Sequence, residues 1–298
     1  MKIDLHIHTT CSDGHFSPKE VIDEAVKNEV KIIAIADHDT IEAYNEELFE
    51  YAKNKGIQII PAVEISTKNE KAGIHVLGYN FDINNNEFKE QLYLIRNARH
   101  DYLHKVGKEL NKLDYLLNIA ELDKIDSVTK AHIALAIINN PKNEQKLIES
   151  FGHIPNKGEF IETIMNEGCP AYVKKVSVTP KKAAEIIRKA GGKVVLAHPV
   201  AYQHEDNLTD SEILKIVEDM NADGVEANYI YADRNNIKFD ETKKWNEFAK
   251  IHGLKVTIGS DFHNADGIRP KIGLPNENIE MTESEIEKLV EWLLNTEK

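Results

Sequence analysis

Residues 3–15 read IDLHIHTTCSDGH, and this stretch decides how the rest of the chain is interpreted. The alternation of apolar and polar residues predicts a strand, whose successive side chains point to opposite faces. His6 and His8 would therefore lie on one face, opposite the apolar residues 3, 5 and 7. A single His-x-His pair is commonly a pair of polar surface residues, so its meaning depends on the residues at the ends of the other strands.

Short apolar runs alternate with helical stretches along the chain, which is typical of parallel strands joined by crossover helices. Helix start signals fall between the runs: Ser17 and Glu20 form a capping box around Pro18, and Thr282 and Glu285 form another. Seven strands favour an irregular barrel. We expect them at residues 3–8, 31–36, 58–63, 75–79, 194–197, 224–227 and 255–259.

The strand pattern stops between about residues 84 and 170, where helical periodicity extends from Phe88 to Asn139. We therefore expect an α/β fold in which a distorted (β/α)7 barrel is interrupted by a helical cap over the substrate. The barrel would comprise residues 1–84 and 171–298, and the insertion residues 85–170.

Composition narrows the class of protein. No apolar run approaches the roughly 18–20 residues that a membrane-spanning helix needs. The N-terminal sequence MKIDLHIHTT lacks the features of an export signal, so we expect a cytoplasmic protein. The 2 cysteines are too few for a disulfide framework or a thiolate zinc site.

The chain carries a formal net charge of −13. Even three bound divalent cations would leave it negative, which opposes the attraction of long duplex nucleic acid. We expect the partner to be a small phosphorylated molecule or a short oligonucleotide.

Histidine and carboxylate side chains lie on or directly after the expected strands. A single such histidine is often a satisfied core or loop residue, but side chains at strand C-termini converge on one mouth of a barrel. Imidazole suits manganese, iron and zinc, and carboxylates can bridge two ions. The pattern predicts a multinuclear hydrolytic site that activates hydroxide without a protein nucleophile. The candidate ligands are His6, His8, Asp13, His38, Glu64, His75, His198, Asp261 and His263.

Six segments together resemble the motifs of the polymerase and histidinol phosphatase (PHP) superfamily, and the resemblance covers the whole chain. The insertion is most similar to the branch that contains bacterial 3',5'-nucleoside bisphosphate phosphatases, some of which also trim short RNA from the 5' end. The segments are DLHIHTTCSDG (4–14), IAIADHDT (33–40), PAVEIS (61–66), IHVLGY (74–79), VVLAHP (194–199) and IGSDFH (258–263).

This resemblance implies three divalent metal ions, with Mn²⁺ expected and Fe²⁺ or Zn²⁺ as alternatives. Glu64 would bridge two of them, and His15 competes with Asp13 because some relatives use a histidine at this place. The implied sets are His6, His8, Glu64 and Asp261 for the first ion, Glu64, His75 and His198 for the second, and Asp13, His38 and His263 for the third.

The insertion supplies candidate substrate contacts. Arg96 and Arg99 are three residues apart and hence neighbours on one helix face, although such arginines are often only solvated. Similar proteins carry a Ser/Thr-Arg-x-His segment, which here reads Thr129, Lys130, Ala131 and His132. The lysine ammonium carries the same charge as the guanidinium of arginine but cannot form two parallel hydrogen bonds. The positive charge toward phosphate is therefore kept, whereas bidentate binding is lost. His132 also fits a buried helix histidine.

We expect the protein to be a metal-dependent phosphatase that removes the 3'-phosphate of nucleoside 3',5'-bisphosphates. Three alternatives remain open: a histidinol-phosphate phosphatase, a 5'-3' exoribonuclease acting on short RNA, and a non-catalytic PHP module that mediates interactions. Loss of several metal ligands is the usual mark of the last, and none of the nine is missing here.

Overall fold

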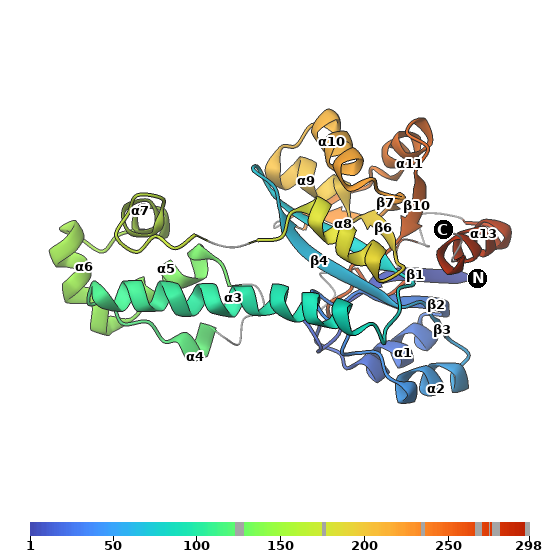
Figure 1. The fold of residues 1–298 in the computed structure, drawn as a ribbon, viewed down its shortest axis with the longest axis horizontal. Coiled ribbons are helices and arrows are strands. Elements are labelled where there is room, and N and C mark those ends of the chain that lie inside the picture. Colours follow the sequence, from blue (N-terminus) through green and yellow to red (C-terminus); the bar gives the residue numbers. More distant parts are fainter. Residues whose placement is uncertain are drawn as a thin grey trace. The chain divides into compact units, whose positions relative to one another are not determined.

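The computed structural model describes residues 1–122, 128–174, 177–233, 236–265, 270–273, 275 and 281–295, except for the side chains of residues 99 and 100. The chain divides into two compact units, coloured along the sequence in Figure 1. Unit 1 comprises Met1–Tyr93 and Val178–Lys298, and unit 2 comprises Leu94–Ser177.

In the part of the chain that the structure describes, the main strands of unit 1 form two sheets. The first has the order β1-β2-β3 and is parallel, and the second has the order β10-β7-β6-β5-β4. Isolated parallel bridges link the two sheets at two places: His38, which follows β2, pairs with Glu64, and Ile7 pairs with Phe262. The strands are β1 (Lys2–Ile7), β2 (Val30–Ile35), β3 (Gln58–Ile59), β4 (Ala62–Lys68), β5 (Gly73–Tyr79), β6 (Lys193–Leu196), β7 (Gly224–Asn228) and β10 (Lys255–Ile258).

The expected α/β class is confirmed, and the two bridges link the sheets in the order that the expected distorted barrel requires. The expectation of parallel strands throughout is wrong for β5, which runs antiparallel to both β4 and β6. Only residues 69–72 connect β4 to β5, and a parallel crossover needs about a dozen residues or more. The connection is a tight turn in which Asn69 Oδ1 accepts hydrogen bonds from the backbone N–H groups of Lys71 and Ala72.

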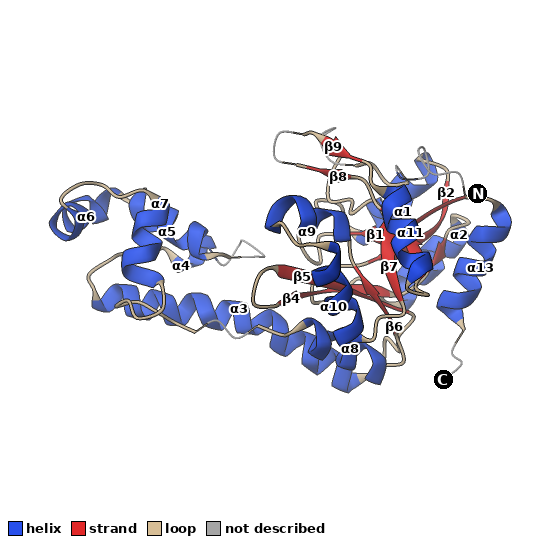
Figure 2. Cartoon of the chain, turned by 90° about the horizontal axis from the view of Figure 1, so that it is seen from above, coloured by secondary structure: helices blue, strands red, loops and turns tan. Residues whose placement is uncertain are grey.

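Helices surround the strands of unit 1, drawn blue around red in Figure 2. The expected capping boxes are confirmed: Ser17 caps the first helix together with Glu20, and Thr282 caps the last together with Glu285. A small hairpin of β8 (Tyr231–Ala232) and β9 (Lys238–Phe239) follows β7. The helices are α1 (Pro18–Lys27), α2 (Glu46–Asn54), α8 (Pro180–Lys189), α9 (Pro199–Asp206), α10 (Asp210–Met220), α11 (Thr242–Ile251) and α13 (Glu283–Leu294).

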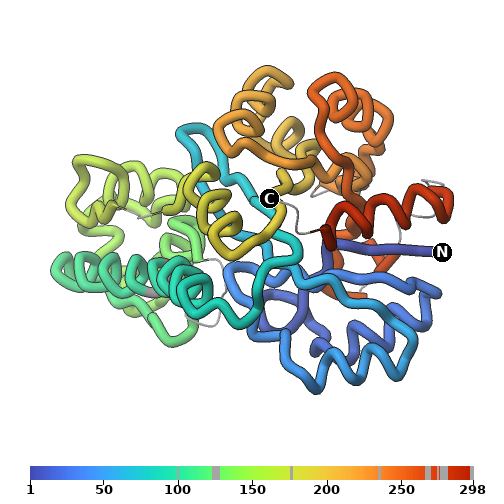
Figure 3. Tube along the Cα trace, turned by 45° about the vertical axis from the view of Figure 1, so that its right-hand side comes forward, coloured from blue at the N-terminus to red at the C-terminus, as the bar shows by residue number. Residues whose placement is uncertain are grey.

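The last helix closes the core of unit 1 against the first strand. Ile286 and Leu293 of α13 belong to the same buried cluster as Ile3 and Leu5 of β1. Figure 3 shows this helix, in red, beside the blue N-terminal strand. Burial of these apolar side chains is worth roughly 1.5–3 kcal/mol each, which fixes the N-terminal strand that carries the His-x-His pair.

Unit 2 is helical and has a core of its own. The core includes the aromatic residues Tyr102, Tyr115 and Phe160, all of them buried. The division between the units falls within α3, so the expected limits of the insertion, residues 85 and 170, stay a prediction. The elements are α3 (Asn86–Lys112), α4 (Ile119–Leu122), α5 (Lys130–Ile138), a 3₁₀ turn (Pro141–Asn143), α6 (Glu144–Phe151), α7 (Lys157–Phe160) and a π-helical turn (Ile161–Met165).

Candidate metal centre

Five histidines surround the carboxylate of Glu64, which lies on β4 and is 1% exposed. They come from β1, β5 and the segments that follow β1, β2 and β6. Histidines from segments far apart in the sequence therefore lie around the carboxylate of Glu64. Glu64 Oε2 lies 3.2 Å from His6 Nε2, His8 Nε2 and His38 Nδ1, and Glu64 Oε1 lies 2.9 Å from His75 Nδ1 and 3.1 Å from His198 Nε2.

Asp261 completes a group of four on one side of Glu64. Its Oδ1 lies 3.1 Å from His8 Nε2 and 3.5 Å from His6 Nε2. One donor atom from each of His6, His8, Glu64 and Asp261 lies within 4.8 Å of the others. These are the four residues expected to hold the first ion.

Asp13 forms a second group with histidines on the other side of His8. Its Oδ2 lies 3.2 Å from His263 Nε2 and 3.9 Å from His38 Nε2, and its Oδ1 lies 3.5 Å from His8 Nδ1. These four residues again place donor atoms within 4.8 Å of one another. The rival residue His15 is exposed, and its backbone N–H donates to the carbonyl of His263. The geometry favours Asp13 over His15.

The third group consists of His38, Glu64 and His75. His198 approaches the same Glu64 oxygen as His75, at 3.1 Å. His8 and His38 each belong to two groups, so the structure shares these histidines between neighbouring positions, whereas the resemblance assigned each to a single ion.

The donor set fits divalent cations. Glu64 Oε2 and His75 Nδ1 are buried and make no hydrogen bond, although nearly all buried polar atoms in proteins have a partner. The two atoms lie among further imidazole nitrogens and carboxylate oxygens, which are the ligands that manganese, iron and zinc accept. Bound cations would accept lone pairs from both Glu64 Oε2 and His75 Nδ1.

The acids and histidines of this cluster alter one another's proton affinities. Burial opposes the charge on His8, but the Asp261 and Glu64 carboxylates outweigh this effect and raise its pKa to about 10. Burial lowers the pKa of His38 to about 3, and the charge of the neighbouring His8 and His75 adds to this effect. At neutral pH, His8 of the metal-free protein therefore holds a proton and His38 does not.

The two carboxylates at the centre stay ionised. Burial would raise the pKa of Glu64, but the charge of His75 and His6 lowers it well below its ordinary value. The pKa of Asp261 is lowered in the same way, against burial, chiefly by His263 and His6. Both are available as anionic ligands across the physiological pH range.

Neighbouring polar residues hold the ligand segments in place. Asp37 accepts hydrogen bonds from Thr9 N–H at 2.7 Å and from the Ser12 hydroxyl at 2.6 Å, which fixes the loop between His8 and Asp13. The Tyr202 hydroxyl accepts from the backbone N–H of His75 at 2.8 Å. These contacts restrict the ligands before any ion binds.

Two candidate ligands have backbone conformations that L-residues rarely adopt. His198 has φ of 23° and Asp261 has φ of 54°, and each directly follows or lies close behind a strand. Such conformations cost on the order of 1–3 kcal/mol and persist where the surroundings impose them. At these positions His198 Nε2 lies 3.1 Å from Glu64 Oε1, and Asp261 Oδ1 lies 3.1 Å from His8 Nε2.

Sequence reasoning missed Glu226, which is 1% exposed on β7. Its Oε1 lies 3.0 Å from His6 Nδ1, the ring nitrogen that does not face Glu64. The only signal available was a charged residue inside the otherwise apolar run 224–227, and that signal does not indicate a partner.

The candidate substrate residues lie in unit 2, whereas the nine candidate ligands belong to unit 1. Thr129 and His132 cap each other at the start of α5, a local structural role. Lys130 Nζ lies 3.0 Å from Asn166 Oδ1. Arg96 lies on α3, and the side chain of Arg99 is outside the described residues.

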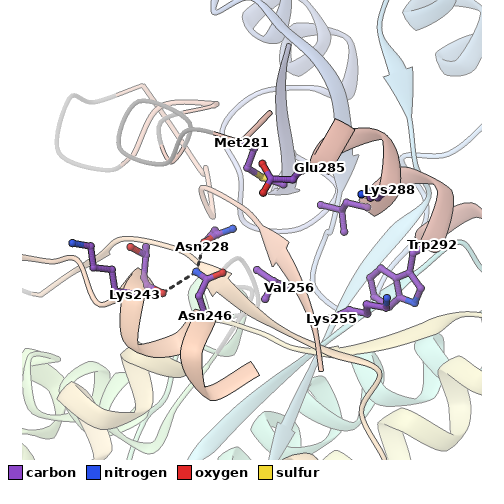
Figure 4. Close-up of a pocket in the computed structure, with 11 residues that line it drawn as sticks. Asn228, Lys243, Asn246, Lys255, Val256, Met281, Glu285, Lys288 and Trp292 are labelled. Atoms are coloured by element: carbon purple, nitrogen blue, oxygen red, sulfur yellow. Dashed lines mark hydrogen bonds between the residues drawn. The ribbon is translucent and has the colours of Figure 1, made fainter. Parts of the chain in front are cut away.

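A pocket of about 520 Å³ lies along β10 between α11 and α13, and it is lined by none of the nine candidate ligands. Figure 4 shows Lys243, Lys255, Lys288 and Trp292 among its lining residues. The metal centre is therefore a separate feature of unit 1.

Within the part of the chain that the structure describes, no helix has both the length and the apolar character needed to cross a membrane.

Known proteins resemble this chain along most of its length. A 5'-3' exoribonuclease of Haemophilus influenzae is 33% identical over 88% of this chain and 90% of its own length. A 3',5'-nucleoside bisphosphate phosphatase of Chromobacterium violaceum is 26% identical over 88% of this chain and 87% of its own length.

The fold also matches a solved structure. An amidohydrolase from Chromobacterium violaceum, described with bound sulfate and no metal, superposes with a TM-score of 0.63 and 25% identity over 92% of this chain and 90% of that one. The model of the PHP domain family matches residues 4–166, which contain six of the nine candidate ligands. With this match and the similarity of its relatives, the chain belongs to the PHP domain family.

Proposed function

We propose that this chain, a metal-dependent phosphoesterase of the PHP family, removes the 3'-phosphate of nucleoside 3',5'-bisphosphates. The observation that carries the proposal is the arrangement at Glu64, where nitrogen atoms of His6, His8 and His38 lie 3.2 Å from one buried oxygen that makes no hydrogen bond. Such a convergence of ligand atoms fits bound cations. The bisphosphate phosphatase of Chromobacterium violaceum supports the choice of substrate.

We propose three divalent ions, of which Mn²⁺ is the first choice. Bound divalent ions lower the pKa of water and neutralise charge on the phosphoryl oxygens. The chain's own contribution is to present ligands in fixed positions. His6, His8, Glu64 and Asp261 would hold one ion, Glu64, His75 and His198 a second, and Asp13, His38 and His263 a third.

Glu64 has the central role in this arrangement, because its two oxygens face different sets of histidines. A carboxylate in this position can bridge two cations and offset their mutual repulsion. Its lowered pKa keeps it anionic even though it is buried. No other carboxylate among the described residues of the cluster lies close to five imidazole rings.

The charge of the chain favours small substrates. With a formal net charge of −13, the protein repels long polyanions at a distance, whereas a mononucleotide or short oligonucleotide is repelled less and can be held by a few local contacts. Lys130, Arg96 and Arg99 are the residues that we propose for binding a 5'-phosphate. Thr129 and His132 would support Lys130 by fixing the first turn of α5.

A second candidate is 5'-3' cleavage of short RNA. It is supported by the 33% identity of this chain to the 5'-3' exoribonuclease of Haemophilus influenzae. The two reactions are chemically related, because each can break the ester at the 3'-oxygen of a 5'-phosphorylated nucleotide. The same metal centre could serve both, and the difference would lie in whether a further nucleotide follows the 3'-phosphate.

The test is phosphate and nucleotide release by purified protein supplied with Mn²⁺. Four substrate types separate the candidates: nucleoside 3',5'-bisphosphates, nucleoside monophosphates, 5'-phosphorylated short RNA and histidinol phosphate. We expect the highest kcat/KM with the bisphosphate. Turnover of histidinol phosphate alone would contradict the proposal, and no turnover of any ester would indicate a non-catalytic module.

Two variants make this test specific. Glu64→Gln removes the shared anion and should abolish turnover of every substrate. Glu218→Gln changes an exposed carboxylate on α10 and should leave all rates unchanged. Equal rates in the wild type and Glu64→Gln would show that the activity comes from a contaminating enzyme.

A further inference from the structure

Glu226 makes contacts to two candidate ligands that come from different strands. Its carboxylate lies 3.0 Å (Oε1) and 3.2 Å (Oε2) from His6 Nδ1, and Oε2 accepts a hydrogen bond from the backbone N–H of His198 at 2.9 Å. His6 and His198 approach different oxygens of Glu64 with their Nε2 atoms. The buried Glu226 carboxylate thus contacts two histidines, one beside each oxygen of Glu64.

The contact with His6 crosses a strand. β7 pairs with β10, and β10 lies between β7 and β1, because the bridge of Ile7 to Phe262 joins the segment after β10 to β1. Gly259 occupies the crossing point. A Cβ atom there would lie 2.2 Å from Glu226 Oε1 and 2.3 Å from His6 Cβ, so only glycine leaves room for the carboxylate to reach the ring.

The contact with His198 acts on the backbone. His198 has φ of 23° and precedes Pro199, a combination that is sparsely populated and needs support from its surroundings. The hydrogen bond from its N–H to Glu226 holds the peptide at the point where the chain leaves β6. This orientation directs the His198 ring toward Glu64.

We infer that Glu226 is a positioning residue of the metal centre: it orients His6 through the ring Nδ1 and His198 through the backbone, so that both Nε2 atoms face the bound cations. A carboxylate behind a ligating histidine fixes the ring orientation and increases its basicity. Glu226 itself contacts neither cation nor substrate. The inference rests on the proposed metal site and extends it.

The first test is calorimetric titration of metal-free protein with Mn²⁺. Glu226→Gln keeps the shape but supplies only one acceptor oxygen for two donors, so we expect affinity to fall roughly 10- to 100-fold. The matched control is Glu241→Gln, which alters a histidine–carboxylate pair with His204 that lies outside the metal centre, at 2.8 Å. Wild-type affinity in Glu226→Gln would overturn the inference.

A double-mutant cycle separates positioning from a general loss of stability. If Glu226 acts through His6, then Glu226→Gln should reduce affinity much less in a His6→Ala background than in the wild type. Purely additive losses would show that Glu226 does not act through this ring. Thermal unfolding of each variant checks that the protein remains folded.

Proton NMR of the metal-free protein gives a reading that does not depend on metal or activity. The wild type should show a downfield Nδ1–H resonance of His6 that exchanges slowly with water, assigned by its absence in His6→Gln. This resonance should shift in Glu226→Gln and disappear in Glu226→Ala. An unchanged resonance would overturn the inference, whereas failure of the wild type to bind Mn²⁺ would contradict only the proposed function.

Discussion

His38 and Glu64 are joined through both backbone and side chains. A parallel bridge pairs the two residues, and His38 Nδ1 lies 3.2 Å from Glu64 Oε2. The flanking hydrogen bonds run from Asp39 N–H to the Glu64 carbonyl at 2.9 Å and from Glu64 N–H to the Asp37 carbonyl at 3.3 Å. One of the two places where the sheets are bridged is therefore also a place where candidate metal ligands meet.

Removing a single ligand should abolish activity without unfolding the barrel. His38→Ala and Asp261→Ala delete imidazole and carboxylate donors but leave the backbone bridges between the sheets. We expect kcat to fall on the order of 100-fold or more, since each ligand serves a shared centre. Turnover with Mn²⁺ and circular dichroism measure the two effects. Near-normal rates in both variants would contradict the assignment.

Metal affinity should rise with pH. The pKa of His8 is raised to about 10 by Asp261 and Glu64, which overcome the opposing effect of burial. At pH 7 the imidazole of the metal-free protein is protonated, and a cation can bind its nitrogen only when that proton leaves. Affinity should therefore increase between about pH 6 and 8, and binding should release protons.

Calorimetry in buffers of different ionisation enthalpy measures the number of protons released. His38 should contribute none at pH 7, because burial and the neighbouring histidines lower its pKa to about 3. An affinity that does not change with pH, together with a heat of binding that is independent of the buffer, would contradict the charge state assigned to His8.

Asp13 and His15 can be separated by substitution. Asp13→Ala removes a carboxylate whose Oδ2 lies 3.2 Å from His263 Nε2, so we expect the protein to bind less metal and to lose most of its activity. His15→Ala removes an exposed ring and should change neither. Metal content after dialysis decides between them, and the reverse result would make His15 the ligand.

Lys130 provides a test of the proposed phosphate contact. Lys130→Ala should raise KM for a nucleoside 3',5'-bisphosphate about tenfold, because a charge-assisted hydrogen bond contributes about 1.5–3 kcal/mol. The KM of a nucleoside 3'-monophosphate, which has no 5'-phosphate, should not change. Lys142→Ala, which alters an exposed lysine of the same unit, is the control. Equal increases in KM for both substrates would reject the contact.

Much of the fold and of the cluster could be predicted because the relevant signals are local. Each strand is a short apolar run, and most candidate ligands lie at a strand end, where the geometry of a barrel brings them together. Glu64 illustrates the point: its position directly after the third expected strand made it a candidate ligand, the resemblance made it the shared one, and the structure places five histidines around it.

The features that could not be predicted depend on contacts between distant segments. Glu226 reaches His6 only because Gly259, directly after β10, has no side chain to fill the space between them, and no spacing in the sequence predicts this contact. The alternation predicted for β1 is also incomplete. Ile7 belongs to a different core cluster from Ile3, and the pairing of β1 with β2 shifts between Asp4 and Ile7.

The substrate residues show a different limit. The segment from Thr129 to His132 fits a family motif, but the structure also gives it a structural role as the cap of α5. A threonine with a partner three residues later satisfies the first N–H groups of a helix whatever the chain binds. The motif alone therefore cannot separate a phosphate contact from a helix cap.

The most direct test of the metal centre is elemental analysis of the protein after saturation with Mn²⁺ and removal of free ions, with Glu64→Gln measured in parallel. We expect about three ions per chain in the wild type and a marked loss in the variant, because one carboxylate serves two of the proposed sites. Manganese at background level in the wild type, or equal amounts in both proteins, would contradict the proposed centre.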